Sequence, residues 1–241
     1  MIAEHGGKSM KLSLIIPAYD EEKTLPDVLS RVCRLAERMD LEIIAVDDGS
    51  RDGTARVLEG FRPPSPRVAY RFLRHGENRG KGAAVRTAIA AATGEVVVIQ
   101  DADLEYDPAD ISDLIAPIAD GRADAVFGSR FLAGPHRVHL FWHRVGNALV
   151  TLAANVLYNM NFTDIETGYK AFRREVIQGM RLRSEDFRIE PEITAKLCRA
   201  KCRIYEIPVS YSGRGYAEGK KITWRDGIRA LWTLIKYRII N

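Results

Sequence analysis

The stretch Val96-Val-Val-Ile-Gln-Asp-Ala-Asp-Leu-Glu105 decides the fold and locates the candidate chemistry of this 241-residue chain. Its first four residues are apolar and β-branched, which predicts a buried strand. Three acidic residues, Asp101, Asp103 and Glu105, follow the strand directly. Because ligands of open α/β sheets bind beyond the carboxyl ends of the strands, the position of this acidic turn indicates a functional site.

The three acidic residues of this turn suit a metal ion. Neighbouring carboxylates repel each other unless a cation lies between them or one of them is protonated. Oxygen ligands without a nearby His or Cys favour a hard cation, Mg²⁺ or Mn²⁺, held jointly by protein and phosphate. We therefore predict Asp101, Asp103 and Glu105 as metal ligands. An Asp-x-Asp pair alone is more often a solvated acidic turn, so the functional interpretation depends on the rest of the chain.

Apolar runs and helical patterns alternate on both sides of the central strand. Further strands are predicted at residues 12–16, 43–46, 68–73, 125–127, 169–172 and 204–207. Helices are predicted at residues 24–39, 82–92, 140–160, 190–202 and 222–240, and from residues 107 and 175 onward. Thr24, with Asp27 three residues later, is the predicted N-cap of the first helix. This alternation predicts an α/β fold with a mostly parallel sheet covered by helices on both faces.

Length and composition favour one main domain with short additions. A hydrophobic content of 46% is ordinary for a globular core. We expect a loose tail at residues 1–10, a main domain at 11–221 and an amphipathic helix at 222–241. The three cysteines show no disulfide pattern, which fits a reducing cytosol. There is no signal-peptide pattern, and no apolar run approaches the roughly 20 residues that span a bilayer.

The basic charge is concentrated near the C-terminus. Residues 199–241 contain ten Lys or Arg and three Asp or Glu, a local charge of +7, so the remainder carries −3. Such a surface favours an anionic partner. Basic residues beside Trp232 and Tyr237 fit a helix lying on anionic lipid, and they equally fit a core-packing helix with a solvated basic face. Nucleic-acid binding is a third hypothesis, but it leaves the acidic turn unexplained, so we expect no nucleic-acid partner.

Polar clusters follow four predicted strands and are expected to meet. In a parallel sheet, clusters at the carboxyl ends of the strands lie along the same edge. They comprise residues 19–22, 47–53, 101–105 and 128–130. The basic residues that could complement them are Lys81, Arg130, Arg214, Lys220 and Lys221. Together, carboxylates and basic groups suit a metal-bound diphosphate.

Several common enzyme motifs are absent from the sequence. Gly80-Lys-Gly82 lacks the preceding glycine spacing and the following Ser or Thr of a P-loop. No Gly-x-Gly-x-x-Gly follows the first predicted strand, and no Gly-x-Ser-x-Gly elbow occurs. These absences argue against an ATPase, a dinucleotide oxidoreductase and an α/β-hydrolase.

Five motifs together resemble the family 2 inverting glycosyltransferases with the GT-A fold. They are Pro17-Ala-Tyr-Asp-Glu21, Val46-Asp-Asp-Gly-Ser50, Asp52-Gly-Thr54, Asn78-x-Gly-Lys-Gly82 and Gln100-Asp-Ala-Asp103. Gly128-Ser-Arg130 and Thr167-Gly-Tyr-Lys-Ala-Phe172 are similar to the branch of polyprenyl-phosphate (dolichyl-phosphate) mannose and glucose synthases. The resemblance extends from about residue 12 to residue 222, nearly the whole chain.

The resemblance implies a role for each matching residue. The nucleotide sugar would be bound by Pro17, Tyr19, Glu21, Val46, Asp48, Lys81, Asp101, Ala102, Asp103, Arg214 and Lys220. The acceptor phosphate would be bound by Arg130 and Arg144. The catalytic residues would be Asp103, Arg130 and Arg214. Two departures stand out: Glu105 replaces the Gln of many synthases, and the loop Gly213-Arg-Gly-Tyr-Ala-Glu-Gly-Lys-Lys-Ile222 differs from the family pattern.

The implied reaction moves a hexose from UDP-hexose or GDP-mannose to a polyprenyl (dolichyl or undecaprenyl) phosphate, with Mg²⁺ or Mn²⁺. A phosphate monoester is already an anionic nucleophile, so this route needs no general base. Transfer to a hydroxyl of a glycan or small molecule is the alternative, and it requires a base, for which Glu190 and Glu192 are candidates. The same two residues equally fit an acid-rich helix N-terminus around Pro191. We expect the protein in the cytoplasm, peripheral on the inner face of the membrane, alone or with a membrane-protein partner.

Overall fold

The central strand predicted at residues 96–99 is β4 (Val96–Ile99), and all four of its residues are buried. The computed structural model describes residues 10–132, 141–213 and 224–240. Within them, seven strands form one sheet in the order β3-β2-β1-β4-β6-β5-β7. The other strands are β1 (Lys11–Ala18), β2 (Asp40–Asp47), β3 (Val68–Arg74), β5 (Ala125–Ser129), β6 (Lys170–Arg173) and β7 (Ile204–Pro208).

The sheet is parallel apart from one strand, which confirms the expected fold class. β6 pairs antiparallel with β4 on one side and with β5 on the other. The strand order reverses beside β1, with β2 on one flank and β4 on the other. Because clefts of open sheets form where the strand order reverses, the acidic turn after β4 lies at the favoured place for a ligand.

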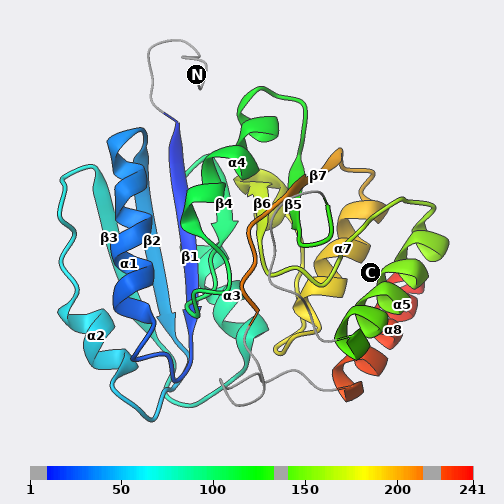
Figure 1. The fold of residues 1–241 in the computed structure, drawn as a ribbon, viewed down its shortest axis with the longest axis horizontal. Coiled ribbons are helices and arrows are strands. Elements are labelled where there is room, and N and C mark those ends of the chain that lie inside the picture. The colour runs from blue at the N-terminus through cyan, green and yellow to red at the C-terminus, as the bar shows by residue number, and fades with distance from the viewer. Residues whose placement is uncertain (1–9, 133–140, 214–223, 241) are drawn as a thin grey trace.

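Helices cover both faces of the sheet, as the alternating sequence pattern predicts (Figure 1). The helices are α1 (Leu25–Cys33), α2 (Thr54–Gly60), α3 (Lys81–Ala91), α4 (Ile111–Ala119), α5 (Phe141–Tyr158), α6 (Arg174–Gln178), α7 (Ile189–Arg199) and α8 (Trp224–Ile239). Two short 3₁₀ helices occupy Arg34–Glu37 and Pro108–Asp110. α1, α2 and α4 contribute to the core on one face, and the remaining five helices to the core on the other.

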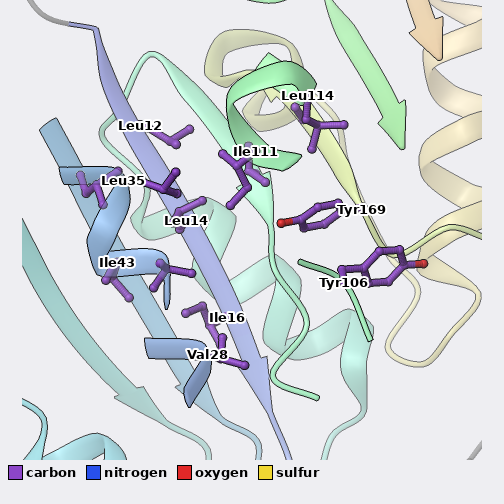
Figure 2. Close-up of a cluster of buried hydrophobic side chains, with 14 of the residues drawn as sticks. Leu12, Leu14, Ile16, Val28, Leu35, Ile43, Tyr106, Ile111, Leu114 and Tyr169 are labelled. Atoms are coloured by element: carbon purple, nitrogen blue, oxygen red, sulfur yellow. The ribbon is translucent and has the colours of Figure 1, made fainter. Parts of the chain in front are cut away.

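Alternation along β1 assigns its side chains to the two cores. Leu12, Leu14 and Ile16 pack with residues of α1 and α4 on one face, and Figure 2 shows this cluster. Ile15 points to the opposite face and packs with residues of α3 and α7. Because successive side chains of a strand point to opposite faces, a run that is apolar throughout serves a sheet buried on both sides.

α1 begins where expected, but the residue at its predicted N-cap does not cap it through its side chain. Thr24 occupies the N-cap position without a capping hydrogen bond. Its hydroxyl lies 2.7 Å from the Ala102 carbonyl and 2.9 Å from a carboxylate oxygen of Glu21. Tertiary contacts therefore override the local capping preference, and the Thr24 side chain links the loop after β1 to the turn after β4.

α8 packs against the core with one side, as the core-packing interpretation of the C-terminal segment predicts. Ala230, Leu234 and Tyr237 are buried in the core that α5 and α7 share. Trp232 is 64% exposed and Ile239 is 77% exposed on the other side of the helix. No helix within the described residues has the length and apolar character needed to cross a membrane.

Candidate active site

The carboxyl ends of β1, β2, β4 and β5 open into a cavity of about 780 Å³. Each of the four polar clusters predicted to meet contributes to its wall, through Tyr19, Asp48, Asp101 and Arg130 among others. The further predicted site residues that line it are Pro17, Glu21, Lys81, Ala102, Asp103, Glu105 and Arg144. The sequence prediction that distant strand ends share one site therefore agrees with the structure.

Three predicted site residues are not among the described side chains that line the cavity. Val46 is fully buried in the core formed with α3 and does not line the cavity. The alternation of β2 accounts for this, because Val46 points away from the side chains that flank it in sequence. Arg214 and Lys220 lie outside the described residues.

Asp48, at the end of β2, fixes the loop that leads into α3. Its carboxylate accepts hydrogen bonds from the amides of Arg79 (3.1 Å) and Gly80 (2.7 Å). The same carboxylate lies 2.6 Å from Nδ1 of His75, whose Nε2 lies 2.9 Å from the hydroxyl of Thr87. Asp48 thus lines the cavity while it anchors the residues before Lys81.

The Gly80-Lys-Gly82 motif lets the start of α3 approach residues 184–186 closely. Gly80 has a φ of +93°, a conformation that L side chains rarely adopt. A Cβ atom on Gly80 would lie 2.4 Å from the carbonyl oxygen of Glu185, and one on Gly82 would lie 2.5 Å from that of Ser184. The two glycines therefore remove the steric obstacle that would push Lys81 away from the cavity.

Lys81 joins two acidic groups that come from different elements. Its Nζ lies 2.8 Å from Oδ1 of Asp101 and 3.3 Å from Oε1 of Glu190, at the start of α7. The other oxygen of Glu190 accepts from the fully buried Nζ of Lys170 at 2.6 Å. Burial alone would lower the pKa of Lys81, but Asp101 and Glu190 outweigh it and hold that pKa above its ordinary value.

The acidic turn itself is tied to the segment after β7. The amide of Glu105 donates to Oδ1 of Asp103 at 3.1 Å. The hydroxyl of Tyr211 donates to Oε2 of Glu105 at 2.8 Å, and the amide of Ser212 donates to the Glu105 carbonyl at 2.9 Å. These contacts fix the turn at the edge of the cavity.

The structure tests whether the acidic turn fits a metal ion. Across the described residues, no three acidic, His or Cys side chains are grouped closely enough to hold a metal by themselves. The expectation of a three-carboxylate set of Asp101, Asp103 and Glu105 is therefore not met in that form. Mg²⁺ is typically held by one or two carboxylates, with substrate phosphates and water completing the sphere. Asp101 and Asp103, both on the cavity wall, fit that arrangement.

Arg130, which follows β5, lines the cavity and is held in place by a buried carboxylate. Asp164, fully buried, accepts from Nε of Arg130 at 2.6 Å and from a terminal nitrogen at 2.7 Å. The guanidinium also lies over the ring of Tyr211, 5.2 Å from its centroid. Burial alone would lower the pKa of Arg130, and Asp164 overcomes this and raises it. Arg144, on α5, lines the same cavity and is exposed.

The two predicted candidates for a general base occupy different environments. Glu192 is fully buried, accepts from the amides of Arg183 and Ser184, and pairs with Lys196 at 2.6 Å. It does not line the cavity, which agrees with a structural role at the start of α7. Glu190 lines the cavity and forms ion pairs with two lysines, although its Oε1, 3.3 Å from Nζ of Lys81, makes no hydrogen bond within the described residues.

Sequence reasoning missed Asp164 and Glu166, which precede β6. Glu166 lines the cavity, and its Oε1 is buried without a hydrogen-bond partner among the residues that the structure describes. Burial raises the pKa of Glu166 to about 7, with a further contribution from the charge of Glu190. The available signal was the Asp164-Ile-Glu166 pair directly before the Thr167–Phe172 motif. Its relevance depends on β6 lying between β4 and β5, which the sequence pattern does not specify.

Comparison with known proteins identifies relatives of the chain. The model of the family described as "Glycosyl transferase family 2" matches residues 13–180. The dolichol-phosphate mannosyltransferase of Pyrococcus furiosus is 30% identical over 233 residues, which cover 95% of this chain and 64% of that protein. An undecaprenyl-phosphate 4-deoxy-4-formamido-L-arabinose transferase of Pseudomonas fluorescens is 32% identical over 87% of this chain and 59% of its own length. The chain thus spans about three fifths of these two relatives.

Solved structures of similar fold support the architecture. Glucosyl-3-phosphoglycerate synthase from Mycobacterium tuberculosis, in complex with Mn²⁺, UDP and phosphoglyceric acid, gives a TM-score of 0.73. The match covers 96% of this chain and 80% of the synthase, with 19% identity. A structure of the same synthase with Mg²⁺ and UDP gives a TM-score of 0.72. At this level of identity the likeness extends to the fold alone.

Proposed function

Because this chain belongs to glycosyl transferase family 2, we propose that it transfers a hexose from UDP-hexose or GDP-mannose to a polyprenyl phosphate, with Mg²⁺ or Mn²⁺. One observation carries the proposal: Asp101 and Asp103 line the same cavity as Arg130 and Arg144. Carboxylates suit the metal-bound diphosphate of a donor, and arginines suit a second phosphate. The named activities of the two curated relatives support a polyprenyl-phosphate acceptor.

The donor end of the cavity carries the groups that suit a departing nucleoside diphosphate. Negative charge grows on the leaving phosphate as the bond to the sugar breaks. A divalent ion held by Asp101 and Asp103 would stabilise that charge as a Lewis acid. Lys81 adds a cationic group at the same wall, and Asp48 with Tyr19 borders the space left for the nucleoside. We assign Arg214 and Lys220 to the donor diphosphate on the family resemblance.

The acceptor end carries the groups that suit a phosphate monoester. Its ionised oxygen attacks the anomeric carbon directly, so no side chain has to remove a proton. Arg130 and Arg144 would orient that phosphate and offset its repulsion from the donor diphosphate. Asp164 accepts two hydrogen bonds from one edge of the Arg130 guanidinium and thereby fixes its orientation. A fixed, planar guanidinium can bind two phosphate oxygens without the entropy cost of ordering a free side chain.

The mouth of the cavity suits a lipid substrate. Trp142 and Leu149 of α5 and Ile228 of α8 line it and are more than half exposed. Arg229 and Lys236 of α8 are exposed beside this apolar surface. Apolar and basic side chains together are typical of a helix pair lying on anionic lipid. We therefore assign the protein to the cytoplasmic, inner face of a membrane, as a peripheral protein alone or with a membrane-protein partner.

A second candidate function is transfer to a hydroxyl of a glycan or small molecule. This route requires a base near the acceptor. Glu166 favours it, because it borders the cavity with an oxygen that no described residue hydrogen-bonds, and its pKa of about 7 suits proton transfer near neutral pH. Glu190 is less suited, since it is bound to Lys81 and Lys170.

The test compares two lipids that differ only in the phosphate. The purified chain is incubated with UDP-glucose or GDP-mannose, Mn²⁺ or Mg²⁺, and either undecaprenyl phosphate or undecaprenol in anionic vesicles. We expect glycosylated lipid from the phosphate alone, with loss of turnover when EDTA removes the metal. Turnover with undecaprenol or a glycan, and none with the phosphate, would instead support the hydroxyl route. Repeating the assay with Glu166→Gln separates the two, because only the hydroxyl route needs that carboxylate.

A further inference from the structure

A chain of four alternating charges lies behind the donor wall of the cavity. It runs from Lys170 through Glu190 and Lys81 to Asp101, with successive N···O distances of 2.6, 3.3 and 2.8 Å. The groups come from β6, α7, α3 and the turn after β4. Solvent exposure rises along this series of four charged groups: the side chain of Lys170 is 0% exposed, and those of Lys81 and Asp101 are 16% and 19% exposed. The series of charged groups therefore leads from the protein interior to the cavity.

This arrangement balances its own charge as it stands. Two ammonium groups and two carboxylates sum to zero, and each carboxylate has a cation within ion-pair distance. A divalent ion at Asp101 would add positive charge beside Lys81, and a diphosphate alone would add negative charge beside Asp101. Either addition by itself is opposed by charge, whereas both together restore the balance.

Resting on the proposed function, we propose that Lys81 is the resident counter-cation of Asp101 and makes the binding of the divalent ion and the nucleotide diphosphate interdependent. In the free protein, its ammonium group pairs with Asp101. When both ligands bind, the ammonium group turns to the diphosphate and Asp101 turns to the metal. The cost of separating Lys81 from Asp101 arises once for two ligands, so each ligand tightens the other. Glu190 reduces this coupling between the two ligands, because it also pairs with the ammonium group of Lys81.

The local backbone is built to present Lys81 at this point. Gly80 and Gly82 permit the contact with residues 184–186, and Asp48 fixes the Gly80 amide. Lys81 is the first residue of α3, so its position follows from where that helix begins. These features hold a single cation between two carboxylates, instead of leaving it on a mobile surface side chain.

The experiment measures metal binding without turnover. Mn²⁺ is titrated into the protein and followed by electron paramagnetic resonance, with and without UDP, and separately with GDP. For wild type, we expect weak Mn²⁺ binding alone and much tighter binding with the preferred nucleotide. Lys81→Met should tighten Mn²⁺ binding in the absence of nucleotide by about tenfold, the size expected for removing one charge beside a partly buried carboxylate. The factor by which the nucleotide tightens Mn²⁺ binding should fall by a similar amount.

Two further variants complete the experiment. Glu190→Gln leaves Lys81 wholly to Asp101, so Mn²⁺ binding alone should weaken by about threefold. Lys11→Met removes a lysine at the opposite end of the sheet, where it pairs with Glu42, and should change neither value. Thermal unfolding checks that each variant is folded.

The outcomes separate this inference from the function on which it rests. If wild type fails to bind Mn²⁺ both in the presence of UDP and in the presence of GDP, the proposed function and the inference both fail. If wild type couples metal and nucleotide but Lys81→Met keeps the same coupling, or binds Mn²⁺ alone more weakly, the inference fails and the proposed function stands. A tighter metal site with reduced coupling supports the inference.

Discussion

Each end of the sheet holds a glutamate away from solvent, but the two carboxylates differ in their hydrogen bonding. At the amino end, Glu42 of β2 is 4% exposed and accepts from the hydroxyl of Ser13 (2.6 Å), the amide of Thr93 (2.7 Å) and the hydroxyl of Thr93 (2.8 Å). Lys11 lies 3.4 Å away. At the carboxyl end, Glu166 borders the cavity with an oxygen that has no hydrogen-bond partner in the described parts of the chain.

The pKa values of the two acids express the same difference. Burial would raise the pKa of Glu42, but the hydrogen bonds from Ser13 and Thr93 outweigh burial and lower it. For Glu166, burial dominates and raises the pKa to about 7. A buried carboxylate whose partners are all present holds elements of the fold together. One that lacks partners costs stability and is available to a ligand.

The largest expected effect comes from removing a carboxylate at the open end. Asp103→Asn should lower kcat/KM for hexose transfer by about 10²–10³-fold, the loss found when one group that stabilises developing charge is removed. The melting temperature should stay close to that of wild type, because Asp103 lines the cavity and not the core. Steady-state kinetics and thermal unfolding measure the two quantities. Asp120→Asn, at an exposed ion pair with Arg122, is the matched control. Unchanged turnover in Asp103→Asn would contradict the assignment of the carboxyl end of the sheet to catalysis.

The closed end should respond in the opposite way. Glu42→Gln should lower the free energy of unfolding by about 1.5–3 kcal/mol while kcat is retained, because it disrupts hydrogen bonds to a buried charge far from the cavity. Since the folded pKa of Glu42 is lowered, its contribution is present above the ordinary pKa of 4.5 and is lost as the pH falls. Urea unfolding at several pH values measures this. Glu59→Gln, exposed on α2, should leave stability unchanged. A loss of activity without a loss of stability would contradict the assignment.

Site residues at the carboxyl end of the sheet were predictable where their place directly after a strand decides their position. Asp101 and Asp103 follow a β-branched run, and the carboxyl ends of parallel strands share one edge, so the sequence pattern alone locates them. Asp48 and Arg130 follow from the same rule. Val46, which was assigned from the family resemblance, has its side chain in the core because side chains alternate along β2. The fold class followed likewise from the alternation of strands and helices.

Other features of the site depend on long-range packing and could not be predicted from local patterns. Asp164 and Glu166 reach the cavity because β6 inserts antiparallel between β4 and β5. Glu190 and Glu192 are two residues apart in α7, and only the structure shows which of the pair meets Lys81. Thr24 matched a capping pattern, but its hydroxyl bonds the carbonyl of Ala102 across the fold.

The smallest expected effect also concerns the open end and has the opposite sign to that of Glu42→Gln. Glu166→Gln should raise the free energy of unfolding by about 1–2 kcal/mol at pH 8. The folded pKa of Glu166 is raised to about 7 from 4.5, so between these pH values the folded protein keeps a proton that the unfolded chain has lost. Wild-type stability therefore falls as the pH rises through this window, and the neutral Gln removes that loss. Urea unfolding between pH 4.5 and pH 8 measures the difference.

The pH dependence is what makes this prediction specific. A gain that is constant across the pH range would reflect packing and not ionisation, and a loss at pH 8 would show that the ionised carboxylate has found a partner. Glu175→Gln, at an exposed position on α6, supplies a control without this dependence. If the gain disappears below pH 4.5 as expected, the open end of the sheet holds a charge that the fold does not need. Such a charge is maintained at a cost in stability, which is the behaviour expected of a group that serves a ligand and not the core.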